Sequence, residues 1–398
     1  MALMGEPQRA APVIHLTGTN GKGSTAQIAT RLLAAQGLTV GTYTSPHLER
    51  VNERISRNGE PIPDDELVEV IASVAALEPL MDEPPTYFEI LTAAAYRWFA
   101  DVAVDAMVVE VGLLGRWDAT NVADGSVAVV TNVGLDHTEY AGPSLLDIAR
   151  EKAGIVKPGA TLVLGETDPD VADVFRAEGA AALWEREVDF TCIENNLAVG
   201  GRMLDIRTPG AVYSELFLPL HGAHQGDNAA AALTAVEAFF GGAPLEPELV
   251  QQAFDDVVMP GRFEVVHRQP LVVLDGAHNV PGAEVLRGVL DDDFTTEGER
   301  LLVVGFLQGR DPEDMLDALG VDDVRLVVAC TPPSPRAVPA REVADAAERL
   351  GATATVVPDV ARAVRRALDE AEMEDVVLVT GSLYVVGAAR MQLVRQRL

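Results

Sequence analysis

The chain has 398 residues, 48% of them apolar, with 61 acidic and 30 basic side chains and a formal net charge of −31. That much apolar sequence exceeds a single small core, so two or three domains are expected. The summed negative field would repel nucleic acid and anionic membranes, which argues against both as partners. No run of about 18 uncharged apolar residues occurs. Residues 1–12 lack the features of a signal peptide, so we expect a cytoplasmic protein.

The basic residues are almost all arginine, because only Lys22, Lys152 and Lys157 are lysine. So acidic a surface repels itself in dilute buffer, whereas at molar salt the Debye length falls to about 3 Å and the repulsion nearly vanishes. We therefore expect a source with a salt-rich cytoplasm, with an acidic mesophilic protein as the alternative. Unfolding in molar KCl, with retention of structure in dilute buffer, would exclude the salt-rich source. A lysine that persists in such a chain is expected to have a task that arginine cannot perform, which directs attention to Lys152.

The first predicted element is a buried strand over residues 13–17, which runs into the turn Gly18-Thr-Asn-Gly-Lys-Gly-Ser24 and then a helix. The glycines let successive backbone N–H groups point at one anion, to which the helix adds its positive end. Lys22 supplies a charge and Ser24 a hydroxyl suited to magnesium. The usual spacing is altered, since Leu16 stands where the first glycine is expected. We interpret the turn as a variant phosphate loop for a nucleoside triphosphate; a glycine-rich turn without a ligand is the alternative.

Alternating helices and strands follow the phosphate loop. The pattern predicts a helix over residues 89–100 and buried strands over 106–111 and 127–132, as in a parallel sheet. Residues 161–220 are less regular, and we assign them to the periphery of the same domain.

Polar residues follow the predicted strands, at the sheet edge where ligands bind in such folds. They are Glu110, Asn132 and His137. A carboxylate such as that of Glu110 is costly to bury unless it is paired or bound to metal. The structural alternative for Glu110 is an ion pair with Arg116, and for His137 a hydrogen-bonded core histidine.

The pattern restarts after a turn at Pro260-Gly261. Strands are predicted over residues 271–275, 301–305, 325–329, 354–358 and 375–380, with amphipathic segments such as 360–371 between them. The predicted fold is α/β: a phosphate-loop ATPase domain with a mostly parallel sheet over residues 1–260, and a smaller, doubly wound, Rossmann-like domain over residues 261–398. The two cysteines, Cys192 and Cys330, are expected to be packing residues without a disulfide.

Motifs along the whole chain, in this order, resemble those of the folylpolyglutamate synthase and dihydrofolate synthase family of the Mur ligase superfamily. The matching segments are Gly18-Thr-Asn-Gly-Lys-Gly-Ser24, Thr44-Ser-Pro-His-Leu48, Asn52-Glu-Arg-Ile55, Val109-Glu-Val-Gly112, Asp118-Ala-Thr-Asn121, Thr131-Asn-Val-Gly-Leu-Asp-His137, Ile148-Ala-Arg-Glu-Lys-Ala-Gly-Ile155, Gly226-Asp-Asn-Ala229, Pro260-Gly-Arg-Phe-Glu264, Asp275-Gly-Ala-His-Asn279 and Thr380-Gly-Ser-Leu-Tyr384.

The resemblance implies a monomeric, ATP-dependent ligase that joins the amino group of L-glutamate to a carboxyl group of dihydropteroate or a reduced folate. The acceptor carboxylate would attack the γ-phosphate, and the glutamate amine would then attack the acyl phosphate. Magnesium at two sites is expected, with manganese and a monovalent cation as further possibilities. The two acceptors are not separable from the sequence, and one enzyme could use both. The alternatives are another ligase of the superfamily acting on a cell-wall-type precursor, or a nucleotide switch without ligase chemistry.

The resemblance also implies the roles of individual residues. Metal ligands would be Ser24, Ser45, Glu110 and His137. The nucleotide would contact Gly18, Thr19, Asn20, Gly21, Lys22, Gly23, Ser24, Thr25, Asn228, Arg262 and Asp275. Catalytic residues would be Lys22, Lys152 as a carbamate, Asp275 and His278, and the acceptor would meet Ser45, Pro46, His47, Arg54 and, weakly, Ser382, for which a strand-end turn is the alternative. One departure is Leu114, which stands where the family has a glycine, so we expect a less open loop there.

Overall fold

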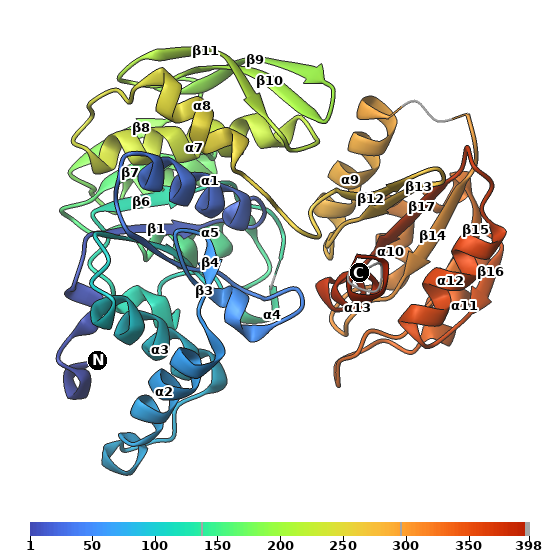
Figure 1. The fold of residues 1–398 in the computed structure, drawn as a ribbon, viewed down its shortest axis with the longest axis horizontal. Coiled ribbons are helices and arrows are strands. Elements are labelled where there is room, and N and C mark those ends of the chain that lie inside the picture. The colour runs from blue at the N-terminus through green and yellow to red at the C-terminus, as the bar shows by residue number, and fades with distance from the viewer. Residues whose placement is uncertain (137, 295–296, 395–398) are drawn as a thin grey trace. The chain divides into compact units, whose positions relative to one another are not determined.

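The computed structural model describes residues 1–136, 138–294 and 297–394 (Figure 1). The described chain separates into two compact units. Unit 1 comprises residues 1–47, 51–219 and 223–258, and unit 2 comprises residues 48–50, 220–222 and 259 onward. His137, one of the expected metal ligands, lies outside the described residues.

Unit 1 is built around an eight-stranded sheet, counted over the described residues, in the order β4-β3-β2-β5-β1-β6-β7-β8. From β2 to β8 all neighbours are parallel, whereas β3 and β4 are added antiparallel at one edge. The central strands are buried on both faces, as expected of a parallel sheet covered by helices. The strands are β1 Val13–Thr17, β2 Val40–Tyr43, β3 Ile55–Arg57, β4 Glu60–Pro61, β5 Ala106–Glu110, β6 Val127–Val130, β7 Thr161–Leu164 and β8 Ala182–Glu185.

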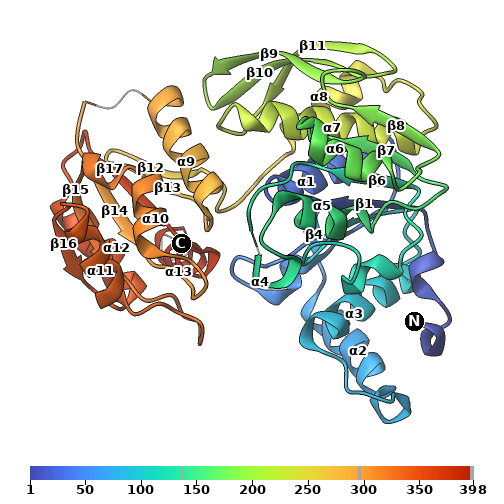
Figure 2. The same ribbon diagram turned by 180° about the vertical axis from the view of Figure 1, so that it is seen from behind.

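Helices cover both faces of this sheet. On one face α1 packs against β2 and β5 and also contacts α7 and α8, while on the other α3, α5 and α6 contribute to the apolar core (Figures 1 and 2). Two of these helices begin at a capping box in the sequence. The box consists of Thr86 with Glu89 in α3 and of Ser144 with Asp147 in α5. The α-helices are α1 Lys22–Ala35, α2 Asp64–Ala75, α3 Tyr87–Asp101, α4 Thr138–Ala141, α5 Leu145–Ala153, α6 Pro169–Arg176, α7 His224–Phe239 and α8 Pro247–Asp255. Short 3₁₀ turns are η1 Ala2–Met4, η2 Pro7–Arg9, η3 Val51–Arg54, η4 Glu78–Leu80 and η5 Ala119–Val122.

The region that looked least regular in the sequence contains a separate antiparallel sheet, ordered β11-β10-β9. Its strands are β9 Thr191–Ala198, β10 Gly201–Arg207 and β11 Val212–Leu218. They lie over α7 and α8, so one face is covered and the other is exposed (Figure 1). The register shifts within β10 interrupt the strict alternation of apolar and polar residues, which explains why the sequence pattern is weak.

Unit 2 has a six-stranded sheet over its described residues, in the order β12-β13-β17-β14-β15-β16. All neighbours are parallel except β12, which the sequence analysis missed and which pairs antiparallel with β13. The strands are β12 Glu264–Arg268, β13 Leu271–Leu274, β14 Arg300–Val304, β15 Val324–Ala329, β16 Ala354–Val356 and β17 Val376–Thr380. The helices are α9 Val280–Asp293, α10 Pro312–Ala318, α11 Ala340–Arg349, α12 Val360–Glu370 and α13 Leu383–Leu393, with the short turn η6 Val321–Asp323. The doubly wound arrangement predicted for this region is confirmed.

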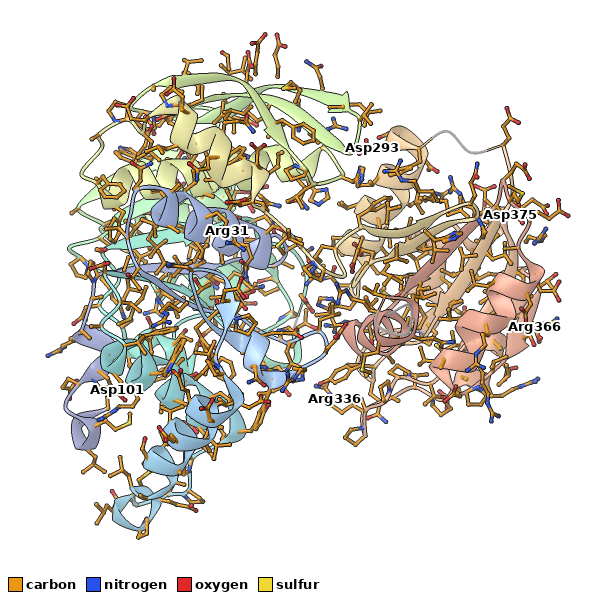
Figure 3. The ribbon with its side chains drawn as sticks, viewed as in Figure 1. Arg31, Asp101, Asp293, Arg336, Arg366 and Asp375 are labelled. Atoms are coloured by element: carbon orange, nitrogen blue, oxygen red, sulfur yellow. The ribbon has the colours of Figure 1, made fainter. Side chains whose placement is uncertain are left out.

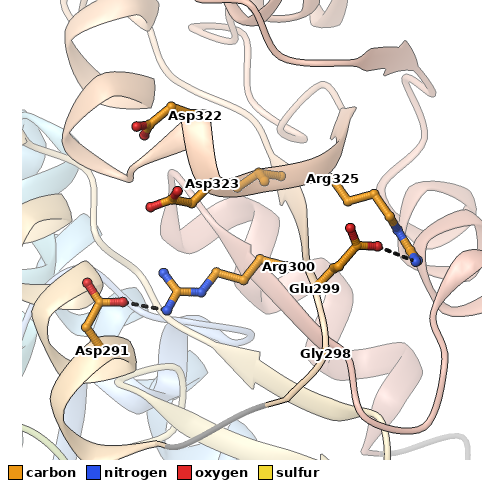
Figure 4. Close-up of a pocket in the computed structure, with 8 residues that line it drawn as sticks. Asp291, Gly298, Glu299, Arg300, Asp322, Asp323 and Arg325 are labelled. Carbon is orange, nitrogen blue, oxygen red and sulfur yellow. Dashed lines mark hydrogen bonds and ion pairs between the residues drawn. The ribbon is translucent and has the colours of Figure 1, made fainter.

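The amino ends of the unit 2 strands carry a network of ion pairs (Figure 4). Arg300 pairs with Asp291, and Arg325 pairs with both Glu299 and Asp375. The Asp375 side chain is 4% exposed and also accepts hydrogen bonds from the backbone N–H groups of Glu299 and Glu372 (Figure 3). Burial alone would raise the pKa of Asp375, but these bonds and Arg325 outweigh burial and hold the pKa below its usual range.

The sequence led us to expect cysteines without a disulfide and no membrane-spanning segment. Cys192 is half-buried and Cys330 is buried, and neither forms a disulfide in the described chain. No helix among the described residues has the length and apolarity that crossing a bilayer requires.

Candidate active site

The phosphate loop follows β1 and is held in place by contacts with two other segments. Gly18 has a φ of +149°, and a Cβ there would lie 1.8 Å from Thr131 Oγ1. Gly21 is left-handed, with a φ of +83°, and a Cβ there would lie 2.3 Å from Asn228 Oδ1 on α7. Glycine is therefore required at both positions, and Asn228, the expected adenine contact, lies directly against the loop.

The segment after β6 grips the phosphate loop through several hydrogen bonds. The Asn132 amide pairs with the backbone of Asn20, accepting from its N–H at 3.0 Å and donating to its carbonyl at 3.1 Å. Thr131 Oγ1 donates to the same carbonyl at 2.6 Å, and Thr19 exchanges bonds with Gly134. The sequence pointed to Asn132 as a strand-end residue and placed Thr131 in a family motif, but it gave no role to the Thr131 side chain. These bonds fix the backbone that would bind phosphate.

Two lysine amines converge on one carbonyl oxygen. Lys22 Nζ donates to the carbonyls of Gly18 and Thr19 at 3.0 and 3.1 Å, and Lys152 Nζ donates to Gly18 at 2.7 Å. Lys152 is 5% exposed. Burial, reinforced by the charge of Lys22 and opposed by Asp136, lowers the pKa of Lys152 well below its usual value. The structure thus brings together two of the three lysines, whereas Lys157 binds Asn121 instead.

Glu110 ends β5 beside the phosphate loop and is 4% exposed. Its Oε2 accepts a hydrogen bond from the Ser45 backbone N–H at 3.0 Å and lies 3.9 Å from the position of a Cβ on Gly23. The neighbouring Ser24 is buried in the first turn of α1. Arg116, the structural alternative as an ion-pair partner for Glu110, pairs with Glu178. A buried carboxylate beside two serines fits a hard divalent cation, although no group of three or more His, Cys, Asp or Glu suited to metal occurs among the described residues.

The segment after β2 holds the expected acceptor residues. The Ser45–Pro46 peptide bond is cis, and Arg54, which is 8% exposed, donates from Nε to His47 Nδ1 at 3.0 Å. The Arg54 guanidinium lies 5.6 Å from the centre of the Tyr87 ring, a cation–π contact. Burial and then the charge of Arg54 lower the pKa of His47, so its imidazole stays neutral near pH 7.

In unit 2, the turn that follows β13 carries Asp275 and His278. The Asp275 carboxylate accepts from the backbone N–H groups of Phe263 and Ala277, both at 2.8 Å. Burial raises the pKa of Asp275, while Arg262 and these two bonds oppose the rise. His278 Nδ1 lies 2.9 Å from the Gly276 carbonyl. A carbonyl only accepts, so Nδ1 carries the proton and Nε2 is the basic nitrogen.

Ser382 and Arg262 complete the expected set in unit 2. Ser382 is 2% exposed and caps α13, its Oγ accepting from the N–H groups of Tyr384 and Val385 at 3.2 and 3.3 Å. The cap gives Ser382 a local structural role at the end of β17, close to the strand-end turn that was the alternative, and its contact with substrate stays a prediction. Arg262 Nη1 donates to the Gly276 carbonyl at 3.4 Å, against the turn that bears His278.

A phosphate loop on a parallel sheet, chained to a second doubly wound unit, is the organisation of a Mur ligase. The Mur ligase middle domain matches residues 16–236, and the Mur ligase, glutamate ligase domain matches residues 261–383. The dihydrofolate synthase/folylpolyglutamate synthase of Mycobacterium tuberculosis is 37% identical, over 98% of this chain and 88% of its own length.

Solved structures of proteins named for the same activities have the same fold as this chain. Mycobacterium tuberculosis folylpolyglutamate synthase complexed with ADP and AMPPCP superposes with a TM-score of 0.94 at 38% identity, covering 99% of this chain and 94% of that one. The bifunctional folylpolyglutamate synthase/dihydrofolate synthase of Yersinia pestis, complexed with AMPPNP and an Mn ion, gives 0.87 at 33% identity, covering 100% and 92%. The chain belongs to the folylpolyglutamate synthase/dihydrofolate synthase family of the Mur ligases. The resemblance and the α/β fold inferred from the sequence are confirmed.

Proposed function

We propose that this protein is an ATP-dependent ligase that joins L-glutamate to dihydropteroate, to reduced folates, or to both. The observation that carries the proposal is the phosphate loop with two lysine amines on the Gly18 carbonyl and the buried Glu110 alongside it. A site that binds phosphate, a cation and a carboxylate substrate fits the activity for which the relatives are named.

The reaction has two bond exchanges. An acceptor carboxylate oxygen bonds to the γ-phosphorus while the bond from that phosphorus to the bridging oxygen of ADP breaks, giving an acyl phosphate. The glutamate amine then attacks the acyl carbon, loses a proton, and phosphate leaves. Lys22 and the loop amides would bind the phosphates and stabilise charge that develops on them. His278 Nε2, with its ring held through Nδ1, would accept the proton of the amine.

A divalent cation, magnesium or manganese, fits the oxygen donors of Glu110, Ser24 and Ser45, with His137 as a further ligand. When bound, it would neutralise charge on the triphosphate and on the attacking carboxylate. A second divalent site and a monovalent cation site would add further positive charge beside the triphosphate.

Lys152 is proposed to carry a carbamate. Its amine is driven to the neutral form by burial and by the nearby Lys22 charge, and only a neutral amine attacks carbon dioxide. The neutral amine forms an N–C bond to carbon dioxide, one C–O π bond shifts its electrons to oxygen, and one N–H proton leaves. The neutral side chain thereby becomes an anionic carbamate whose carboxylate could hold the metal site. Arginine, which stays protonated, cannot replace it.

The acidic composition supports two further parts of the proposal, a salt-rich source and the absence of nucleic-acid or membrane partners. A cytoplasmic location and a monomeric state complete the proposal, and the monomeric state rests on the resemblance to the family.

The test is ADP formation by the purified protein in molar KCl with magnesium and L-glutamate, offering dihydropteroate and tetrahydrofolate separately and analysing products by mass. A glutamate adduct on either acceptor supports the ligase and tells which acceptor is used. ADP release that needs neither acceptor nor glutamate would point to a nucleotide switch, and turnover only with a cell-wall-type precursor would point to another Mur ligase.

A further inference from the structure

The strand that leads into the phosphate loop carries two polar side chains on one face of an otherwise apolar run. His15 and Thr17 of β1 alternate with Ile14 and Leu16, and both polar residues are 0% exposed. Successive residues of a strand point to opposite faces, so His15 and Thr17 share one face. Burying a polar group costs free energy unless it is hydrogen-bonded, so the partners of these two side chains indicate why they are there.

Both side chains bond to the same segment, residues 112–121, which follows β5. His15 Nε2 lies 2.9 Å from Thr120 Oγ1, and Thr17 Oγ1 donates to the Leu114 carbonyl at 2.6 Å. Tyr96 adds a bond from α3, donating its hydroxyl to the Thr120 carbonyl at 3.0 Å.

The Thr120 hydroxyl determines which group donates in the hydrogen bond between His15 and Thr120. Its hydroxyl donates to Asp118 Oδ1 at 2.5 Å, so the same oxygen accepts from His15, and His15 carries its proton on Nε2. His15 Nδ1 is buried and finds no hydrogen-bond partner within the described chain. Burial, and secondarily the charge of Lys157, lowers the pKa of His15 to about 3, so this donor is neutral at working pH.

Asp118 connects Thr120 to the beginning of the same segment through hydrogen bonds. Its carboxylate accepts from the N–H of Thr120 at 2.9 Å and from the N–H of Leu113 at 2.7 Å. Leu114, where the family has glycine, is held at a φ of +61°, a conformation that leucine rarely adopts. The bond from Thr17 fixes the carbonyl of that strained residue.

The place of the segment in the sheet indicates which ligand it serves. β5 lies between β1, which leads into the phosphate loop, and β2, which leads into the Ser45–His47 segment. Residues 112–121 therefore emerge between the nucleotide loop and the expected acceptor residues, at the edge where such sheets bind ligands. Gly112 packs closely against Phe88, next to the Tyr87 ring that faces Arg54.

We propose that His15 and Thr17 are positioning residues: through Thr120, Asp118 and Leu114 they set the conformation of residues 112–121, on which binding of the pterin-type acceptor depends. This inference rests on the proposed ligase function. It assigns a task to a buried histidine that the reaction itself does not use.

The test compares His15→Val, His15→Gln and Thr17→Val with the wild type. Glutamine can still donate from an amide nitrogen, so it serves as the conservative rescue. The control is Thr42→Val, which breaks an equally buried bond, Thr42 to Thr30 at 2.7 Å, that does not touch the segment. Steady-state kinetics give KM for acceptor, ATP and glutamate, and hydrogen exchange without ligands reports on the segment's amides.

His15→Val and Thr17→Val are expected to raise the acceptor KM by about tenfold, the loss of one buried hydrogen bond, with ATP KM changed less than about twofold. Exchange over residues 112–121 should quicken in both, and His15→Gln should recover most of each effect. Unchanged exchange over the segment, or equal rises in all three KM values, would overturn the inference. If the wild type makes no adduct, the proposed function fails on its own, and the exchange result still decides whether His15 holds the segment.

Discussion

The two ends of the unit 2 strands use charged residues in different ways. At the amino ends, Arg300 pairs with Asp291 of α9, and Arg325 pairs with Asp375, which also accepts a hydrogen bond from the Glu299 backbone N–H. At the carboxyl ends, Asp275 and His278 bond to backbone groups instead: Asp275 accepts from the N–H groups of Phe263 and Ala277, and His278 bonds to the Gly276 carbonyl. The ion pairs at the amino ends join one segment of the fold to another. The backbone bonds at the carboxyl ends fix the orientation of side chains that are expected to take part in the reaction. The carboxyl edge of unit 1 follows the second pattern, because Lys22 and Lys152 bond to carbonyls.

The comparison predicts that substitutions at carboxyl ends remove activity and those at amino ends remove stability. The largest effect is expected for Lys152→Arg, which keeps the positive charge but excludes a carbamate. We expect a fall in kcat of at least about a hundredfold, as for loss of a group that stabilises developing charge. Lys157→Arg, at the lysine that bonds Asn121 rather than the phosphate loop, is the matched control and should keep near-wild-type kcat, with any change confined to the acceptor KM. Comparable activity of the two variants would show that Lys152 needs no modification.

Asp375→Asn tests the opposite end of the strands. It removes a buried charge from Arg325 and weakens two backbone bonds, so the free energy of unfolding should fall by about 2 kcal/mol. Chemical denaturation measures this, and kcat and all KM values should stay unchanged. Because the folded pKa of Asp375 is lowered, its contribution is complete at neutral pH and is lost as pH falls through the acidic range. A variant that is inactive yet fully stable would break the comparison.

His15 gives an effect on stability that is small just below pH 6.5 and grows as the pH falls. Its folded pKa of about 3 lies below the unfolded value of 6.5, so the unfolded chain binds the extra proton. Stability is therefore complete above pH 6.5 and falls by about 1.4 kcal/mol for each unit below it, until the folded pKa is reached. Subtracting the unfolding curves of His15→Gln from those of the wild type at pH 7, 6 and 5 isolates this slope. Parallel curves would mean that His15 takes up its proton over the same pH range in the folded and the unfolded chain, so that its pKa is not lowered by burial.

The smallest effect is expected at Leu114, whose left-handed backbone glycine adopts without strain. Leu114→Gly should leave the free energy of unfolding within about 1 kcal/mol of the wild type, since relief of strain offsets the greater freedom of the unfolded chain. Leu114→Val should lower it by more than about 1 kcal/mol, because a β-branched side chain is worse in this conformation. Thermal unfolding of the pair measures the difference. Equal stability of the two variants would argue against backbone strain at this position.

The sequence predicted most of the fold because its signals were local. The alternation of apolar strands and amphipathic helices, and the turn from Gly18 to Ser24, each lie within a few residues. It missed β12 and the regular sheet β9 to β11, where bulges and half-exposed strands blur the period of two.

In the candidate site, too, the sequence predicted features with a local signal and missed contacts between distant residues. Lys152 could be suspected from lysine scarcity, but its bond to the Gly18 carbonyl joins residues 134 positions apart and has no local signal. The same holds for Thr131 against Gly18 and for His15 against Thr120. Ser382 shows the reverse, since a motif residue proves to cap a helix.

The central claim, a ligase that acts through an acyl phosphate, is tested most directly with an acceptor carrying ¹⁸O in its carboxylate. After one turnover with ATP and L-glutamate, mass analysis of the released phosphate tells where that oxygen went. An acyl phosphate route places one ¹⁸O atom in the phosphate for each amide formed, because the carboxylate oxygen bonds to phosphorus and leaves with it. Phosphate without the label, alongside amide product, would contradict the acyl phosphate.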